Sequence, residues 1–247
     1  MRWARPLVCG VALLSAIPLA ACQSTQDKAA EAREEGERLL AAQVPLKIEK
    51  PNKDISVKSV TVLHDVNGGA VAVEVQNNSK DTLVGVPILA DVRDAKGKRV
   101  FINNAYGSEY ALNHVPLMRP GETVTWVNDQ ILAAGTPETA KVTVGQPDSK
   151  NPSQIPDIAV SPPSLERDSS GPVVRGSMTN QSSIDQKKLV LFAVSRQGGK
   201  IIAAGRGGYK NLRVDAKKPG NYNIFFIGDP TGGDITVTAP PSVIEAP

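Results

Sequence analysis

The sequence predicts an all-β protein with two tandem β-sandwich domains, and three observations support this prediction. Beyond Pro51 the chain consists of short runs rich in Val, Ile and Thr, separated by Gly, Asn, Asp and Pro. Apolar and polar residues alternate in these runs, as they do in strands with one buried face. The pattern stops once, between Gly145 and Pro156, and then restarts. With 247 residues, the chain is long enough for two domains that each bury a core.

The first domain is predicted at residues 51–146. Its clearest strand places Val71, Val73 and Val75 on one face and Glu74 and Gln76 on the other, as a strand with one buried face requires. Seven such runs fit a sandwich. They are Ile55–Leu63, Ala70–Gln76, Leu83–Arg93, Lys98–Asn104, Glu109–Val115, Thr123–Leu132 and Ala140–Val144.

A linker is predicted at residues 147–156, because three prolines stand there among Ser, Asn and Gln with no apolar pattern. The second domain follows at residues 157–240, and residues 241–247 are predicted to be a disordered tail. The strands expected in this domain are Pro172–Thr179, Lys188–Ser195, Lys200–Ala204, Asn221–Gly228 and Asp234–Thr238.

Landmarks of the two domains recur in the same order about 100 residues apart, which predicts an internal repeat. Asn and Gly tolerate the left-handed backbone of tight turns. Trp126 and Phe225 each follow the Pro-Gly landmark of their own domain at the same distance, and we expect both to pack between the sheets. The paired landmarks are Asn77-Asn78-Ser79 with Asn180-Gln181-Ser182, Gly97-Lys98 with Gly199-Lys200, and Pro120-Gly121 with Pro219-Gly220.

Residues 1–21 are predicted to be a signal peptide. Arg2 and Arg5 precede an apolar run, Leu7–Ala21, that is broken only by a Gly, a Ser and a Pro. This run is shorter than the ~20 residues that a membrane-spanning helix needs, and it ends in small residues. A permanent transmembrane helix is therefore disfavoured.

The end of this run, Leu19-Ala20-Ala21-Cys22, resembles the lipobox of bacterial lipoproteins. The resemblance implies that Cys22 is the lipid-attachment residue and becomes the new N-terminus after cleavage. The protein would then be held at the cell membrane by acyl chains such as palmitate, facing the extracytoplasmic side. The alternative is an ordinary secretory signal in which Cys22 is incidental.

Residues 22–50 are predicted to be the lipidated N-terminus and a helical tether. Four glutamates are interleaved with two arginines between Gln26 and Gln43, and Glu34 and Arg38 stand four residues apart in the favourable order. Such a helix would be about 25 Å long at ~1.5 Å per residue. A solvated spacer is the favoured interpretation, and a partner-binding helix is the alternative.

A second resemblance concerns the segment Val86–Val100. Its strand, Leu89-Ala90-Asp91-Val92-Arg93-Asp94, and its turn, Ala95-Lys96-Gly97-Lys98, are similar to the strand and "D-x-x-G-K" hairpin of FxLYD-type and related immunoglobulin-like domains of bacterial lipoproteins. The aromatic-Leu-Tyr signature is absent, and the second copy has Ser195-Arg196-Gln197-Gly198 at the acidic turn. The resemblance implies tandem immunoglobulin-like sandwiches and no functional residue.

The charge and the cysteines narrow the classes of partner. Removing Arg2 and Arg5 from the 28 basic side chains leaves 26 against 25 acidic ones, so no broad basic field for nucleic acid is expected. Both cysteines lie within the first 22 residues. The folded part is therefore expected to contain neither disulfides nor cysteine-bound metal.

No catalytic, cofactor or metal site is predicted. His64 and His114 are the two histidines, and neither belongs to a zinc-binding motif. His64 is expected in a solvated turn, and His114 on a strand facing water. No G-x-S-x-G sequence is present, and Ser195 lacks a recognisable base nearby. The prediction is a protein that is not an enzyme, although an active site assembled from distant residues stays open.

Three other patterns are interpreted as turns. Gly205-Arg206-Gly207-Gly208 lacks the Lys-Ser/Thr of a phosphate-binding loop, which favours a flexible β-turn. Asp215, Asp229 and Asp234 lack the spacing of a calcium loop and are expected to be turn acids. The two Asn-x-Ser sequences are likewise expected in turns rather than in glycosylation sites.

These observations together lead to two hypotheses about function. The first is a membrane-anchored, non-catalytic interaction or accessory module with a protein or cell-envelope partner, which would use loops or strand edges. The second is a lipoprotein that binds a small ligand or a metal and serves a transporter. The second hypothesis requires a polar pocket between the two domains.

Overall fold

The computed structural model describes residues 45–244 except 106, 134, 169–170 and 209–211. The predicted signal peptide, Cys22 and the predicted helical tether as far as residue 44 lie outside the described residues, as does the tail beyond residue 244. The described chain is nearly all β and forms several antiparallel sheets, which confirms the predicted fold class.

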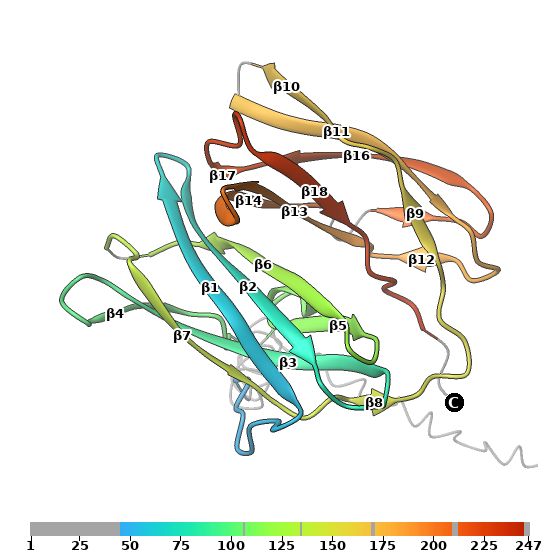
Figure 1. Ribbon diagram of the computed structural model, residues 1–247, viewed down its shortest axis with the longest axis horizontal. Coiled ribbons are helices and arrows are strands. Elements are labelled where there is room, and N and C mark those ends of the chain that lie inside the picture. Colours follow the sequence, from blue (N-terminus) through green and yellow to red (C-terminus); the bar gives the residue numbers. More distant parts are fainter. Residues whose placement is uncertain (1–44, 106, 134, 169–170, 209–211, 245–247) are drawn as a thin grey trace, which may run out of the picture. The chain divides into compact units, whose positions relative to one another are not determined.

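The N-terminal sandwich consists of strands β1–β8 (Figure 1). One sheet has the order β1-β2-β6, and the other is built on β3, which pairs with β4, β5, β7 and β8. The order β1-β2-β6 opposite β4-β3-β7 fits an immunoglobulin-like sandwich. The strands are β1 (Ile55–Asp65), β2 (Gly68–Asn77), β3 (Leu83–Arg93), β4 (Arg99–Ile102), β5 (His114–Met118), β6 (Thr123–Ile131), β7 (Thr139–Val144) and β8 (Ser149–Lys150).

The C-terminal sandwich consists of strands β9–β18 and repeats this order. Its sheets are β10-β11-β16, with β9 beside β11, and β17-β14-β13-β18, while β12 pairs with β15 (Figure 1). The strands are β9 (Ile158–Val160), β10 (Ser164–Asp168), β11 (Gly171–Asn180), β12 (Gln186–Lys187), β13 (Val190–Gln197), β14 (Lys200–Gly208), β15 (Arg213–Val214), β16 (Pro219–Phe225), β17 (Ile227–Gly228) and β18 (Asp234–Thr238).

The two Asn-x-Ser sequences make the same contacts in the two sandwiches. The Asn77 Nδ2 donates to the Asp81 carbonyl at 2.8 Å, and its Oδ1 accepts from the backbone N–H and the hydroxyl of Ser79 at 2.9 and 2.7 Å. The Asn180 side chain does the same with Ile184 and Ser182, at 2.8, 3.0 and 2.7 Å. Both asparagines are fully buried, so these bonds satisfy amide groups that have no access to water.

The aromatic landmark was assigned to the wrong residue in the second sandwich. Trp126 is fully buried opposite Val73, as expected, but Phe225 is 42% exposed. The residue in the position of Trp126 is Tyr222, which pairs with Gly176 and is 5% exposed. Side chains along β16 alternate between its inner and outer faces. Phe225 lies an odd number of residues from Tyr222, so it points to the outer face.

The predicted strand at Glu109–Val115 is wrong in its first half. Residues Tyr110–Leu112 form the 3-10 turn η1, which buries Ala111 and Leu112, and β5 begins only at His114. The Trp126 Nε1 donates to the Ala111 carbonyl at 2.8 Å. This bond fixes η1 against the core of the N-terminal sandwich.

The segment 147–156 is attached to the N-terminal sandwich along part of its length. It contains β8, which pairs with the beginning of β3. The Asn151 Oδ1 accepts from the Thr82 backbone N–H at 2.9 Å, and the Lys150 Nζ lies 3.0 Å from the Asp81 carboxylate. These contacts hold the end of the first sandwich close to the start of the second.

The sheets β1-β2-β6 and β17-β14-β13-β18 pack against each other, and we call this contact the inter-sandwich interface. Residues of both sandwiches belong to a single buried cluster there, so that Pro45–Pro247 forms one compact unit. Strands β2 and β13 are therefore buried on both faces, which explains their nearly continuous apolar sequences. The apolar residues at its centre are Ala72, Val127, Val190, Phe192, Val194 and Ala204.

Candidate functional site

Two arginines of the C-terminal sandwich lie at the inter-sandwich interface. The first, Arg206 on β14, has a fully buried side chain whose Nε lies 2.8 Å from Asp129 Oδ1. The Arg206 backbone N–H donates to the other carboxylate oxygen of Asp129 at 2.9 Å, and the Glu109 carboxylate lies 3.9 Å from Arg206 Nη2. Burying a cation is unfavourable unless carboxylates and hydrogen bonds compensate it, and both are present here.

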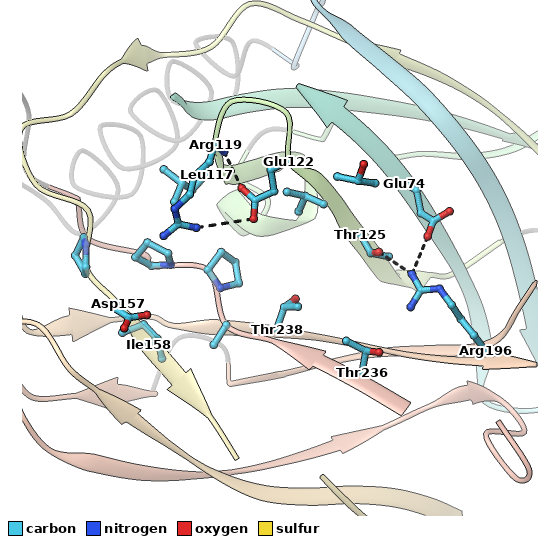
Figure 2. A pocket seen from close by; sticks show the side chains of 16 residues that line it. Glu74, Leu117, Arg119, Glu122, Thr125, Asp157, Ile158, Arg196, Thr236 and Thr238 are labelled. Atoms are coloured by element: carbon cyan, nitrogen blue, oxygen red, sulfur yellow. Dashed lines mark hydrogen bonds and ion pairs between the residues drawn. The ribbon is translucent and has the colours of Figure 1, made fainter. Parts of the chain in front are cut away.

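The second arginine, Arg196 on β13, lies where the interface opens to solvent. Its Nη2 donates to Glu74 Oε1 at 2.8 Å and to the Thr125 hydroxyl at 2.9 Å (Figure 2). The Ser59 hydroxyl donates to the other oxygen of Glu74 at 2.6 Å. The hydrogen bond from Ser59, followed by that from Arg196, lowers the pKa of Glu74, because both bonds favour its ionised form.

A cleft of about 370 Å³ begins beside Arg196 and is lined by both sandwiches (Figure 2). Its upper wall in the figure comes from β6 and includes Thr125, and its lower wall comes from β18 and includes Thr236 and Thr238. Thr123, also on β6, belongs to the lining as well. Four threonines therefore line the cleft. This lining offers hydroxyl donors and acceptors together with small apolar groups.

The outer end of the cleft carries a second ion pair. The Glu122 carboxylate accepts from the Arg119 backbone N–H at 2.7 Å, and its other oxygen lies 3.8 Å from Arg119 Nη1. The turn that connects β5 to β6 thus holds both charges at the rim. Pro156, Pro240 and Pro241 also line the cleft.

Asp157 is the remaining charge of the cleft lining. It is exposed, and only its backbone carbonyl has a partner, the Gln181 N–H at 2.9 Å. Its carboxylate forms no hydrogen bond or ion pair with the residues that the structure describes. Arg196 is paired with Glu74 and Arg119 with Glu122, so the lining of the cleft has one net negative charge, located at Asp157.

The residues that the sequence offered as catalytic candidates, His64, His114 and Ser195, do not line the cleft. His64 is exposed at the end of β1 and lines a separate depression of about 310 Å³. Ser195 is fully buried, and its hydroxyl donates to the Pro230 carbonyl at 3.0 Å. Asp229 forms the expected turn, since its carboxylate accepts from the Thr231 N–H at 3.0 Å. A hydrogen bond from the Thr231 side chain, followed by this backbone bond, lowers the pKa of Asp229.

Two of the sequence interpretations are wrong. Residues 205–208 belong to β14 and do not form a flexible turn. His114 begins strand β5, as expected, but it does not simply face water, because its ring stacks on Tyr110 with centroids 4.1 Å apart. Burial lowers the pKa of His114 and, together with a hydrogen bond of 2.5 Å to Asp148, raises that of Tyr110. Asp148 precedes β8, so this cluster holds that strand in place.

The cleft itself was missed by the sequence analysis. Its walls come from residues that are more than 100 positions apart, and threonines on exposed strands carry no distinctive motif. One signal of a covered face was available. Ala72 lies on the same face of β2 as Glu74, and an apolar residue there is less typical of a face exposed to solvent. Within the described residues, no group of three or more His, Cys, Asp or Glu side chains could hold a metal ion.

Comparisons with known proteins give no family for this chain. No protein-family profile matches it, and no curated protein matches it significantly in sequence. In the described part of the chain, no helix has both the length and the apolar character to cross a bilayer.

Proposed function

We propose that the chain is a bacterial lipoprotein, held on the extracytoplasmic side of the cell membrane by lipid on Cys22. Its two sandwiches would act as a non-catalytic interaction or accessory module for a protein or cell-envelope partner. Support for the anchor comes from the sequence Leu19-Ala20-Ala21-Cys22. Two acyl chains suffice for stable attachment, since each buried CH₂ contributes about 0.8 kcal/mol.

The observation that carries the binding role is the cleft between β6 and β18. Each of these strands ends its sheet, so each has backbone groups on one side that no neighbouring strand of the described sheets uses. The inter-sandwich interface keeps the two strands at a fixed separation. A preorganised site of this kind binds a partner without first ordering its own walls.

The anchor is tested by metabolic labelling with a palmitate analogue. Wild-type protein should be labelled and recovered with membranes, and the Cys22→Ala variant should be neither, because cysteine alone supplies the thioether sulfur. Cys9→Ala is the matched control, and its labelling should equal that of the wild type. Equal labelling of the wild type and Cys22→Ala would refute the anchor.

The binding role is tested by photo-crosslinking in intact cells. A photoreactive amino acid in place of Thr238, which lines the cleft, should give a specific adduct that mass spectrometry identifies. The same amino acid in place of Thr139, an exposed residue of β7 outside the cleft lining, is the control. Adducts of equal yield and identity at both positions would argue against the cleft as the binding site.

A second candidate is a small-ligand lipoprotein that serves a transporter, as the alternative hypothesis from sequence anticipated. The specific observation in its favour is the cleft volume of about 370 Å³, with a lining of polar groups contributed by both sandwiches. Ligand sites commonly have about 300–1,000 Å³. A thermal-shift screen of sugars, amino acids and ions tests this candidate, because a ligand at 100 times its Kd stabilises the fold by about 2.7 kcal/mol.

A further inference from the structure

We propose that the cleft binds an extended peptide segment with a basic side chain, which pairs with the free edge of β18 as an added strand. This inference rests on the proposed function and names the chemistry of the partner. Three features of the cleft support it: the free edge of β18, the lining residues and the charge at Asp157.

The edge of β18 is available for pairing. In the described sheets β18 pairs with β13 alone, through the register Phe192↔Thr238 to Arg196↔Asp234. A strand of five residues with one paired side presents N–H and C=O groups on the other side. An incoming extended segment satisfies these groups, and main-chain hydrogen bonds then supply most of the affinity.

The lining favours a peptide over a sugar ring. No aromatic side chain lines the cleft among the described residues, so a ring has no surface on which to stack. The side chains of Thr236 and Thr238 line one wall and that of Thr125 the other (Figure 2). Alternate side chains of an added strand point toward the same face at about 6–7 Å intervals, which suits a narrow space between two sheets.

The charge favours a basic residue in that segment. Arg196 is paired with Glu74 and Arg119 with Glu122, so both guanidinium groups are already compensated. The exposed carboxylate of Asp157 at the rim has no such partner among the described residues. A lysine or arginine of the peptide would pair with it.

The test uses fluorescence polarisation with the full chain in detergent. The probe is a short labelled peptide of alternating Val and Thr with one central Lys, compared with versions that carry Glu or Pro at the centre. The Lys peptide should bind, the Glu peptide should bind about fivefold more weakly, and the Pro peptide, which lacks a backbone donor, should lose most of its binding. Equal binding of the three peptides, or no binding, would overturn the inference.

Two matched pairs of variants locate the peptide. Asp157→Asn should weaken binding of the Lys peptide about twofold to fivefold. Asp54→Asn should leave it unchanged, because Asp54 has the same backbone contact in the first sandwich, to the Asn78 N–H at 2.7 Å, but does not line the cleft. Thr236→Lys should weaken binding at least about tenfold by filling the cleft with a long side chain, and Thr139→Lys should not.

Hydrogen exchange supplies the readout for strand addition. Amides of β18 that are open in the free protein should exchange more slowly with the Lys peptide bound, while those of β7 stay unchanged. Binding without protection of β18 would contradict the inference. If cross-links in cells identify a partner at another surface, the inference fails and the proposed function stands; if Cys22 is not lipidated, the anchor fails and peptide binding is unaffected.

Discussion

At the scale of single residues, the buried asparagines show how a polar side chain determines a fold. The Nδ2 group of Asn77 faces the carbonyls of Asp81, Met118 and Arg119 at 2.8, 3.2 and 3.1 Å. It therefore joins the turn after β2 to the turn after β5. The sequence indicated a turn at this position. The contacts with the Met118 and Arg119 carbonyls, which are about 40 residues away in the chain, depend on the tertiary fold.

We expect Asn77→Ala to lower the free energy of unfolding by about 2–4 kcal/mol, because carbonyls in a buried site lose their donor. Asn78→Ala is the control. The Asn78 side chain donates to the Ser56 hydroxyl at 3.1 Å in a solvent-exposed bond, and its removal should change stability by about 0.5 kcal/mol or less. Urea unfolding followed by Trp fluorescence measures both. Similar losses in the two variants would contradict this assignment.

Asp91 predicts a dependence of stability on pH. Hydrogen bonds from Arg99 and then Arg93 outweigh the effect of burial and lower its pKa from 3.8 to about 2. Because the folded-state pKa is depressed, the stabilisation is present above pH 3.8 and is lost as the pH falls toward 2. The arginines are half exposed, so we expect a loss of about 1 kcal/mol.

The variant Arg99→Gln tests this prediction. It should reduce the loss of stability between pH 5 and pH 2, measured by urea unfolding across that range. Lys98→Gln removes the same charge one residue away, where no ion pair with Asp91 exists, and should retain the wild-type dependence. An unchanged profile in Arg99→Gln would show that Asp91 does not contribute.

At the scale of secondary-structure elements, the sequence located the long strands and missed the short ones. The runs predicted at Leu83–Arg93 and Asp234–Thr238 coincide with β3 and β18, because each has enough residues to show a pattern. The two-residue strands β8, β12 and β15 have too few residues to alternate, and their pairing depends on neighbours distant in sequence. Strand β10 was not predicted for a different reason: its side chains are mostly exposed, so it has no buried face that would give an apolar alternation.

Strand β14 was mistaken in part for a turn because glycine is common in both. In the structure, a Cβ on Gly205 would collide with the Phe225 carbonyl oxygen of β16, so a glycine is required by close approach rather than by flexibility. The sequence alone does not distinguish these two reasons.

We expect Gly205→Ala to destabilise the protein by about 3 kcal/mol or more, because the added methyl group meets backbone that has no room to move. The control is Gly97→Asn in the hairpin between β3 and β4. A Cβ there meets nothing, and asparagine tolerates the positive φ of 76°, so stability should change by about 1 kcal/mol or less. The temperature midpoints of unfolding measure the difference. Equal midpoints would refute the steric explanation.

At the scale of the whole molecule, the inter-sandwich interface was the feature least accessible from sequence. Alternation in β2 correctly placed Val71, Val73 and Val75 toward the core of the first sandwich, and it placed Glu74 on the opposite face. That face is covered by the second sandwich, where Arg196 binds Glu74. The cover was not predictable, because it depends on a strand more than 100 residues away, and the cleft at its edge was missed for the same reason.

The interface predicts that the two sandwiches unfold in a single cooperative transition. Asp129→Asn should lower the free energy of unfolding by about 3–5 kcal/mol, since it leaves the Arg206 cation buried without its main counter-charge. Glu49→Gln is the control, because Glu49 pairs with Lys47 on the surface and contributes about 0.5 kcal/mol or less. Differential scanning calorimetry measures both. Two separate transitions in the wild type would contradict the shared interface.

The covered face of β2 also affects how the chain is made. Ribosomes add about 5–20 residues per second, so the first sandwich emerges several seconds before the strands that will cover it. During that interval Ala72 and Val127 are wetted on a face that the finished protein keeps dry. A nascent chain halted between the two sandwiches would therefore be prone to aggregation. Its correct folding depends on prompt synthesis of the second sandwich or on a chaperone that covers this face.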